Sequence, residues 1–226
     1  MKRFALGAVA LLMAQGAMAS SYVTGNVQFH SDGGSDATST LEAGHTFTNS
    51  LGGLTLLTEF DGIQLGEINV DDKGNKLQDS TYVTLGAEQA MNITDNLWVA
   101  AGYHHLVQEG ETIQYRPLVK IGYNMDNISL YHRSRYHIDA TDGDTAGDSL
   151  RTDTSIAYQL NEDVNLKYNF IYNFNDDANN GESRKNSKDH ELRATWTRNG
   201  VQPYFEYRNQ ANNSNNAFVF GASYGF

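Results

Sequence analysis

The amino-acid sequence predicts an all-β fold, a transmembrane antiparallel β-barrel of 12 strands with short periplasmic turns and mostly longer extracellular loops. The first supporting observation is the last segment, 216–226, which alternates large apolar with small residues and stops on Phe226. The second is a series of similar alternating segments, most of them near the roughly 9 to 11 residues that a tilted strand needs to cross a bilayer. The third is the composition. Only 39% of residues are hydrophobic and the mean hydropathy is -0.52, which suits strands that turn every second residue to lipid.

Residues 1–19 have the pattern of a secretory signal peptide. Lys2 and Arg3 precede an apolar run over 4–13, and residues 17–19 offer a cleavage site of small residues. We therefore expect a cleaved signal over 1–19 and a single outer-membrane barrel domain over 20–226. Removing the signal leaves 14 of the 16 bases against 27 acids, and this acidic balance argues against a nucleic acid partner.

The strands are predicted by their alternation and by the Asn, Asp and Gly residues between them. The connections alternate between short turns, which we expect to face the periplasm, and mostly longer acidic loops, which we expect to face outward. Pro117 conflicts with a central strand because it cannot donate a ladder hydrogen bond, and a bulge or a shifted strand boundary would accommodate it. The predicted strands are 22–30, 38–48, 54–62, 80–91, 97–109, 112–123, 128–139, 150–160, 164–175, 189–198, 201–211 and 216–226.

Charged residues decide which face of each strand points inward. On the segment 164–175, one face carries Tyr168 and Phe170, and the other carries Lys167 and Asn169. A base at the lipid midplane costs about 2 to 4 kcal/mol, so the register that turns bases inward is favoured. This register predicts a set of pore-lining, substrate-binding bases: Arg116, Lys120, Arg133, Arg135, Arg151, Lys167, Arg193 and Arg208.

These charges are distributed unevenly around the predicted wall. Between Ser20 and Tyr115 the only bases are Lys73 and Lys76, both in a predicted outer loop, while all eight inward bases come later in the chain. One wall is thus predicted to be basic and the other acidic, and a narrow lumen with low-dielectric walls would focus the field between them. The inward acids of the first arc are Glu42, Glu59, Asp61 and Glu88.

A basic wall in a narrow lumen suits an acidic saccharide. The guanidinium fork of arginine pairs with carboxylates, and inward Tyr131 and Tyr204 could stack on sugar rings. Successive moderate sites allow a solute to enter and to leave. We therefore expect a passive channel for acidic oligosaccharides, without enzymatic activity, cofactor or metal.

Two alternatives remain open. In the first, local pairing neutralises the basic wall, through Glu191 with Arg193, Glu206 with Arg208, and Asp153 with Arg151, and the chain is a non-selective or structural barrel. In the second, the barrel is an outer-membrane lipase that uses His132 and Ser134, which share the apparent lipid face. Their position near a periplasmic turn argues against the lipase.

Two further groups of residues have weaker chemical signals. His104 and His105 are adjacent, so on a strand they point to opposite faces and cannot chelate one metal, and we interpret them as an interface pair. The acidic loop 139–148 contains Asp142 and Asp144 but lacks the EF-hand order of ligands, so an ordinary solvated loop is favoured over a Ca²⁺ site or a divalent bridge to lipopolysaccharide.

Several segments carry a family resemblance: 41–45, 116–117 with 122–123, 131–136, 189–193, 203–207 and the C-terminal strand. On these segments the sequence resembles the small, monomeric, oligogalacturonate-specific porins of bacterial outer membranes, a family that includes sialic-acid channels. The resemblance implies a barrel of 12 strands whose inward arginines and lysines bind acidic saccharides, and it covers the eight bases named above. It also implies a monomer in contact with outer-membrane lipids and lipopolysaccharide, with a final Phe226 that the barrel-assembly machinery reads. The acidic opposite wall departs from the family pattern.

Overall fold

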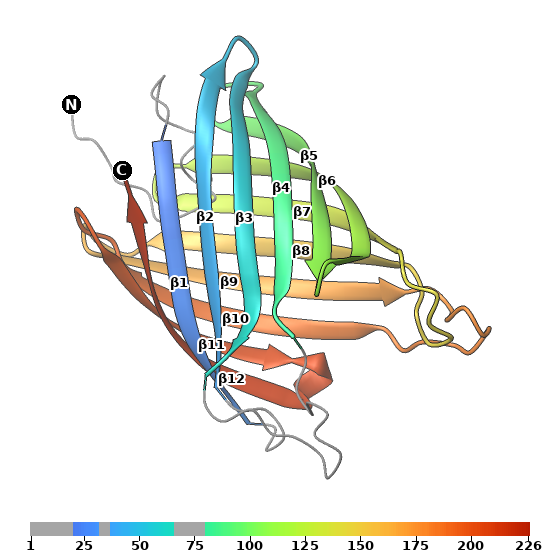
Figure 1. Cartoon of the computed structure of the whole chain (residues 1–226). Helices are drawn as coiled ribbons and strands as arrows, with labels where there is room; N and C mark the ends of the chain where they lie inside the picture. The colour runs from blue at the N-terminus through green and yellow to red at the C-terminus, as the bar shows by residue number, and fades with distance from the viewer. Residues whose placement is uncertain (1–19, 32–36, 66–79) are drawn as a thin grey trace.

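The computed structural model describes residues 20–31, 37–65 and 80–226, so the predicted signal peptide and the predicted loop bases Lys73 and Lys76 lie outside the described residues. The described chain forms a closed barrel in which consecutive strands are antiparallel neighbours and β1 lies beside β12 (Figure 1). No helix in the described part of the chain is long and apolar enough to cross a membrane. The strands are β1 (Ser20–His30), β2 (Thr38–Asn49), β3 (Gly52–Gln64), β4 (Tyr82–Asn92), β5 (Leu97–Gln108), β6 (Glu111–Met125), β7 (Ile128–Asp139), β8 (Ser149–Gln159), β9 (Val164–Asn175), β10 (Ser187–Trp196), β11 (Gln202–Gln210) and β12 (Asn215–Gly225), with a single 3-10 turn η1 (Ala211–Asn213) before β12.

The predicted strands are confirmed, with differences of a few residues at their ends. Residues that tolerate a left-handed backbone close the tight turns: Asp126 has a φ of 35° between β6 and β7, and Gly200 has a φ of 85° between β10 and β11. The β5–β6 hairpin at the opposite end is also tight, because Glu109 and Gly110 both have positive φ, 52° and 90°. Figure 1 shows the two described long loops, after β7 and after β9, at one end of the barrel.

The two ends of the chain close the barrel. β1 and β12 pair over their length, from Tyr22 opposite Gly225 to His30 opposite Ala217. Beyond the register, the backbone N–H of Ser21 donates to the carbonyl of Phe226 (2.8 Å), and the N–H of Phe226 donates back to Ser21 (2.9 Å). The C-terminal residue therefore completes the ladder, which leaves no open sheet edge at this seam.

Pro117 lies inside β6 without a bulge. β6 pairs with β7 in one register on both sides of it, Tyr115 opposite Ile138 and Leu118 opposite Arg135, but Arg116 and Pro117 have no paired residues in β7. Both expected accommodations, a bulge at Pro117 and a shifted strand boundary, are therefore wrong, because β6 continues through Pro117 and the ladder is only interrupted locally. The bulge of β6 occurs nearer the hairpin, where the β5–β6 register shifts between Leu106 and Val107.

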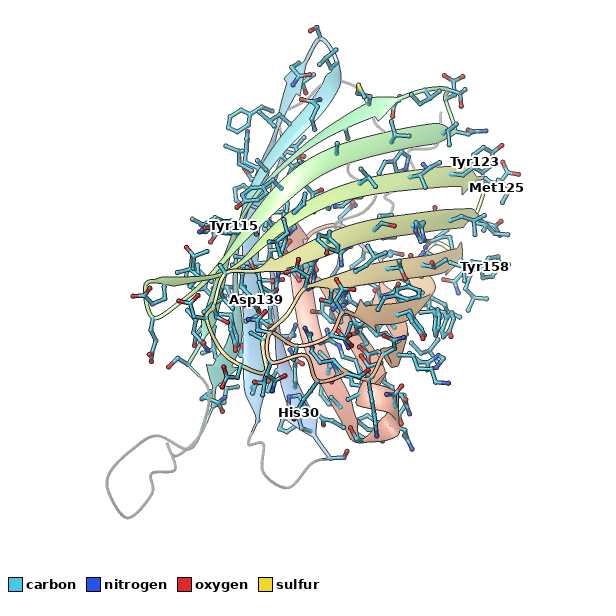
Figure 2. All side chains as sticks on the ribbon, turned by 90° about the vertical axis from the view of Figure 1, so that its right-hand side faces the viewer. His30, Tyr115, Tyr123, Met125, Asp139 and Tyr158 are labelled. Carbon is cyan, nitrogen blue, oxygen red and sulfur yellow. The ribbon has the colours of Figure 1, made fainter. Side chains whose placement is uncertain are left out.

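The two faces of each strand differ as the alternation predicts. In β12, Phe220 is 54% exposed on the outer surface while Val219 is fully buried. Figure 2 shows side chains on both sides of the wall, with Tyr123, Met125 and Tyr158 near the end with short turns and Asp139 near the other end. The outer surface is rich in large apolar and aromatic residues, whereas most of the buried polar residues lie inside.

Inside the barrel, large rings lie against glycines of neighbouring strands. Gly44 lies under the ring of Tyr22, Gly221 under Tyr204, and Gly122 under the indole of Trp98, so closely that a Cβ at any of the three would clash with the ring. Gly122 of β6 is directly opposite Trp98 of β5. These glycines allow bulky rings to lie flat on the wall, which leaves the centre of the barrel open.

We predict that Gly122→Ala lowers the stability of the folded barrel, because the new methyl group displaces the indole of Trp98. Overpacking of this kind costs about 1 to 3 kcal/mol. Urea unfolding in detergent micelles, followed by tryptophan fluorescence and by heat-modifiable gel mobility, measures the effect.

The matched control is Gly25→Ala in β1, where the added Cβ would meet only ordinary contacts, 3.5 Å from Leu41 Cδ1 and from the carbonyl of Thr40. We expect its unfolding midpoint to stay close to that of the unaltered protein. Equal midpoints for the two variants would contradict the role assigned to Gly122.

Candidate substrate pathway

The barrel encloses a cavity of about 520 Å³ whose lining is mostly polar and charged. All eight bases predicted to face inward line this cavity, and they come from β6 to β11. Glu42, Glu59, Asp61 and Glu88 line it from β2, β3 and β4. Three further lining acids come from β8 and β10: Asp153, Asp189 and Glu191.

The register places several of the bases directly opposite one another on neighbouring strands. Lys120 of β6 is opposite Arg133 of β7, and Arg135 of β7 is opposite Arg151 of β8. Lys167 of β9 is opposite Arg193 of β10. Like charges in directly opposed positions destabilise a sheet, so nearby anions must compensate this arrangement.

Asp153 supplies part of that compensation in β8. Its carboxylate bridges two guanidinium groups, with Arg133 Nη2 2.9 Å from Oδ2 and Arg151 Nη2 2.8 Å from Oδ1. The side chain of Asp153 is almost fully buried between them. The expected pair of Asp153 with Arg151 is present, and Asp153 also holds Arg133, its direct cross-strand partner.

Glu206 has the same bridging role in β11. Its Oε2 accepts a hydrogen bond from Arg193 Nε (2.6 Å), and its Oε1 accepts one from Arg208 Nε (2.5 Å). The expected pair of Glu206 with Arg208 is therefore present. The expected pair of Glu191 with Arg193 is wrong, because Glu191 lies directly opposite Arg208 and is 3.8 Å from its Nε, while Arg193 lies opposite Glu206.

Lys120 is compensated from the acidic side of the barrel. Its Nζ forms an ion pair with Glu88 of β4, and the other oxygen of Glu88 is 2.8 Å from His104 Nε2. The interface role expected for His104 is wrong, because this side chain is buried in the lumen beside Glu88. The two histidines point to opposite faces, as expected, and His105 is hydrogen-bonded to the hydroxyl of Tyr103 on the outer surface (2.9 Å).

The remaining three bases have no carboxylate within ion-pair distance in the described chain: Arg116, Arg135 and Lys167. Arg116 Nε donates to Gln114 Oε1 (2.8 Å), and Arg135 Nε donates to His137 Nε2 (2.8 Å). These partners are uncharged acceptors. Arg116, Arg135 and Lys167 therefore retain positive charge that the protein itself does not pair.

The two lumenal tyrosines differ in accessibility. Tyr204 is covered on one face by the guanidinium of Arg193, 4.1 Å from the ring centroid, and its ring also lies against Gly221. The expectation that a sugar stacks on Tyr204 is therefore wrong, because both faces of its ring are occupied. Tyr131 lies beside Trp98, with ring centroids 6.1 Å apart, and it stays partly exposed in the lumen.

Trp98 and His137 are lining residues that the sequence alone did not single out. Trp98 supports Tyr131, and His137 supplies the acceptor for Arg135. The alternation of β5 and β7 places both on the inner face, so an inward position was readable from the sequence. Their partners were not, because those contacts depend on the stagger between strands.

The outer surface contains the histidine and serine of the lipase alternative. His132 Nε2 is 3.1 Å from Ser134 Oγ, and His132 Nδ1 is 2.8 Å from Thr154 Oγ1 of β8.

The acidic loop after β7 forms its own hydrogen bonds. Asp139 Oδ1 accepts from Thr141 N (2.7 Å), and Asp148 Oδ1 accepts from Asp139 N (2.9 Å). Within the described ranges, no three acidic or histidine side chains are placed to hold a metal ion together.

Comparison with known proteins agrees with this geometry. The sequence model of the oligogalacturonate-specific porin protein (KdgM) family matches residues 17–219. No match is found among curated proteins. Similar solved structures include a NanC porin, with a TM-score of 0.67 and 16% identity over 89% of this chain and 98% of that one. They also include a KdgM porin in complex with disordered oligogalacturonate, with a TM-score of 0.64 and 14% identity over 91% of this chain and 99% of that one.

The family match covers most of the chain, and the solved porins share its closed barrel of 12 strands. Family and fold together indicate a channel of the bacterial outer membrane rather than an enzyme, which leaves the outward pair of His132 and Ser134 without a catalytic assignment. The chain belongs to the oligogalacturonate-specific porin (KdgM) family.

Proposed function

We propose that this protein is a passive channel for acidic oligosaccharides such as oligogalacturonates, and that the lumenal bases of β6 to β11 bind them during passage. The observation that carries the proposal is the uncompensated charge of Arg116, Arg135 and Lys167 inside the cavity. One similar solved structure is a KdgM porin in complex with disordered oligogalacturonate, which supports a substrate of this class.

The like-charge cross-strand pairs support the same conclusion. Arg135 is opposite Arg151, and Lys167 is opposite Arg193, so each pair includes one base that lacks a carboxylate partner. Such pairs reduce the stability of the empty barrel, and a bound carboxylate relieves the repulsion. The arrangement is expected where an anionic solute, rather than the protein, supplies part of the compensating charge.

The alternative of a neutralised wall accounts for part of the lumen. Arg133, Arg151, Arg193 and Arg208 are each held by Asp153 or Glu206. These ion pairs fix the guanidinium groups along the wall. The three unpaired bases favour selective binding over a purely structural network.

We extend the proposal to export and to the surroundings of the barrel. Residues 1–19 direct secretion and are then removed, and the barrel-assembly machinery recognises the strand that ends at Phe226. The mature protein is a monomer whose apolar outer surface contacts membrane lipids and lipopolysaccharide.

We predict that the double variant Arg135→Gln/Lys167→Gln weakens block of the channel by trigalacturonate at least tenfold. Two charged hydrogen-bond donors are lost, and tenfold corresponds to about 1.4 kcal/mol. Single-channel recording in planar bilayers, with the sugar added to one side, measures the apparent dissociation constant.

The matched control for that variant is Arg198→Gln. Arg198 lies outside the lumen at a short turn, with its guanidinium 5.4 Å from the ring centroid of Trp196. The Arg198→Gln substitution should leave block by trigalacturonate unchanged. An unchanged apparent dissociation constant for trigalacturonate in the Arg135→Gln/Lys167→Gln channel would contradict the proposed role of the unpaired bases.

We predict the opposite change for Asp153→Asn, which keeps the side-chain shape but removes the charge that Arg133 and Arg151 share. The channel should become more selective for chloride over potassium and should bind trigalacturonate more tightly. Reversal potentials in a salt gradient measure the first effect and current block the second. Asp163→Asn, at an exposed turn, is the control, and a channel with Asp153→Asn that became less anion-selective would refute the prediction.

A further inference from the structure

The lumen contains a second charged surface, which is acidic and to which a simple anion does not bind. We define the acidic arc as Glu42, Glu59 and Asp61, which line the cavity from β2 and β3. Glu42 and Glu59 are directly opposite each other across the two strands, so two carboxylates occupy one cross-strand position. The acidic arc therefore repeats, with opposite sign, the like-charge pairing of the basic wall.

Within the described chain, neutral hydroxyl groups donate hydrogen bonds to two members of the acidic arc. Tyr22 Oη donates to Glu42 Oε1 (2.7 Å), and Thr40 Oγ1 donates to Asp61 Oδ1 (2.6 Å). No lysine, arginine or histidine of the described chain lies within ion-pair distance of these three carboxylates. Glu88, by contrast, is paired with Lys120 and is not part of the acidic arc.

The acidic arc faces unpaired bases across the same cavity. Arg116 and Arg135 lie in the halves of β6 and β7 next to the outer end, and Glu42 and Glu59 lie in the corresponding halves of β2 and β3. Glu59, Arg116 and Arg135 line the same cavity, yet within the described chain Glu59 forms no ion pair with either base. Arg135 is only 9% exposed, so its charge is held in place on the wall.

A solute between these surfaces experiences a transverse field. The low-dielectric barrel wall focuses that field across the lumen. An anion is attracted to Arg116 and Arg135 but repelled by the acidic arc, and a cation experiences the reverse. A solute with a carboxylate on one side and an ammonium group on the other is attracted by both surfaces at once.

We propose that the channel favours zwitterionic saccharides, that is, acidic sugars that also carry a protonated amino group. The inference rests on the proposed function and narrows its substrate class. In the bound orientation, the carboxylate of the sugar pairs with Arg116 and Arg135, and its ammonium group pairs with Glu42 and Glu59.

The test uses four sugars on one skeleton at pH 6: 2-amino-2-deoxygalacturonic acid, galacturonic acid, galactosamine and galactose. Uptake of each labelled sugar is measured in proteoliposomes that contain the whole mature protein, with the membrane potential clamped at zero. The unaltered channel should take up the zwitterion several-fold faster than neutral galactose.

The decisive variant is Glu42→Gln/Glu59→Gln, which replaces both carboxyl groups with amides of similar size. Uptake of the zwitterion should fall to the rate of galactose, while uptake of galacturonic acid should rise. The matched control is Glu111→Gln/Glu162→Gln, which removes two exposed charges outside the cavity lining and should preserve the advantage of the zwitterion. Each single variant, Glu42→Gln and Glu59→Gln, should show a smaller fall in the same direction if the double variant folds poorly.

Two outcomes would overturn the inference: equal uptake of zwitterion and galactose by the unaltered channel, or a zwitterion advantage that survives loss of the acidic arc. Either result leaves the proposed function intact as long as galacturonic acid permeates and trigalacturonate blocks. If neither permeation nor block is seen with these acids, the proposed function itself fails.

Discussion

Closure of the hydrogen-bonded ladder is the constraint on which the rest of this structure depends. In lipid an unpaired backbone N–H or carbonyl group has no water to bind, so every strand needs a neighbour on both sides. β1 and β12 meet this requirement through their own register and through the reciprocal hydrogen bonds of Ser21 and Phe226. Closure gives the sheet one inner and one outer surface. The alternation of side chains along each strand then places every residue on one of these two surfaces.

That assignment explains why the fold was readable from the sequence. The period of two in segments such as 164–175, with bases on one face only, determined both the strand and its inward side. Asn-Gly and related turn residues located the ends. Pro117 shows where a local rule fails. The prediction assumed that a missing donor needs a bulge or a shifted strand boundary, whereas the barrel tolerates a short interruption of the ladder between β6 and β7.

The pairing of charges within the lumen was less accessible from sequence. A strand face shows that Arg193 and Glu191 point the same way, but which residue lies beside Arg193 depends on the stagger of β10 against β11. The structure places Glu206 there and brings Glu191 to Arg208. The covering of Tyr204 by Arg193 has the same origin. Two of the three predicted same-strand pairs are present, Asp153 with Arg151 and Glu206 with Arg208, and the third failed because a residue of the neighbouring strand lies closer.

The lumenal bases thus divide into two groups with different physical roles. Buried carboxylates such as Asp153 and Glu206 hold Arg133, Arg151, Arg193 and Arg208 in fixed positions, and fixed charges stabilise a passing ligand without the cost of ordering flexible side chains. Arg116, Arg135 and Lys167 lack such partners in the described chain, and in the proposed function their charge binds the solute. If all bases were paired, the lumen would attract no anion. If none were paired, their mutual repulsion would oppose folding and one deep site would trap the substrate. In the function that we propose, partial neutralisation permits both a stable empty barrel and release of the substrate, and the acidic arc on the opposite side of the lumen discriminates between charged sugars.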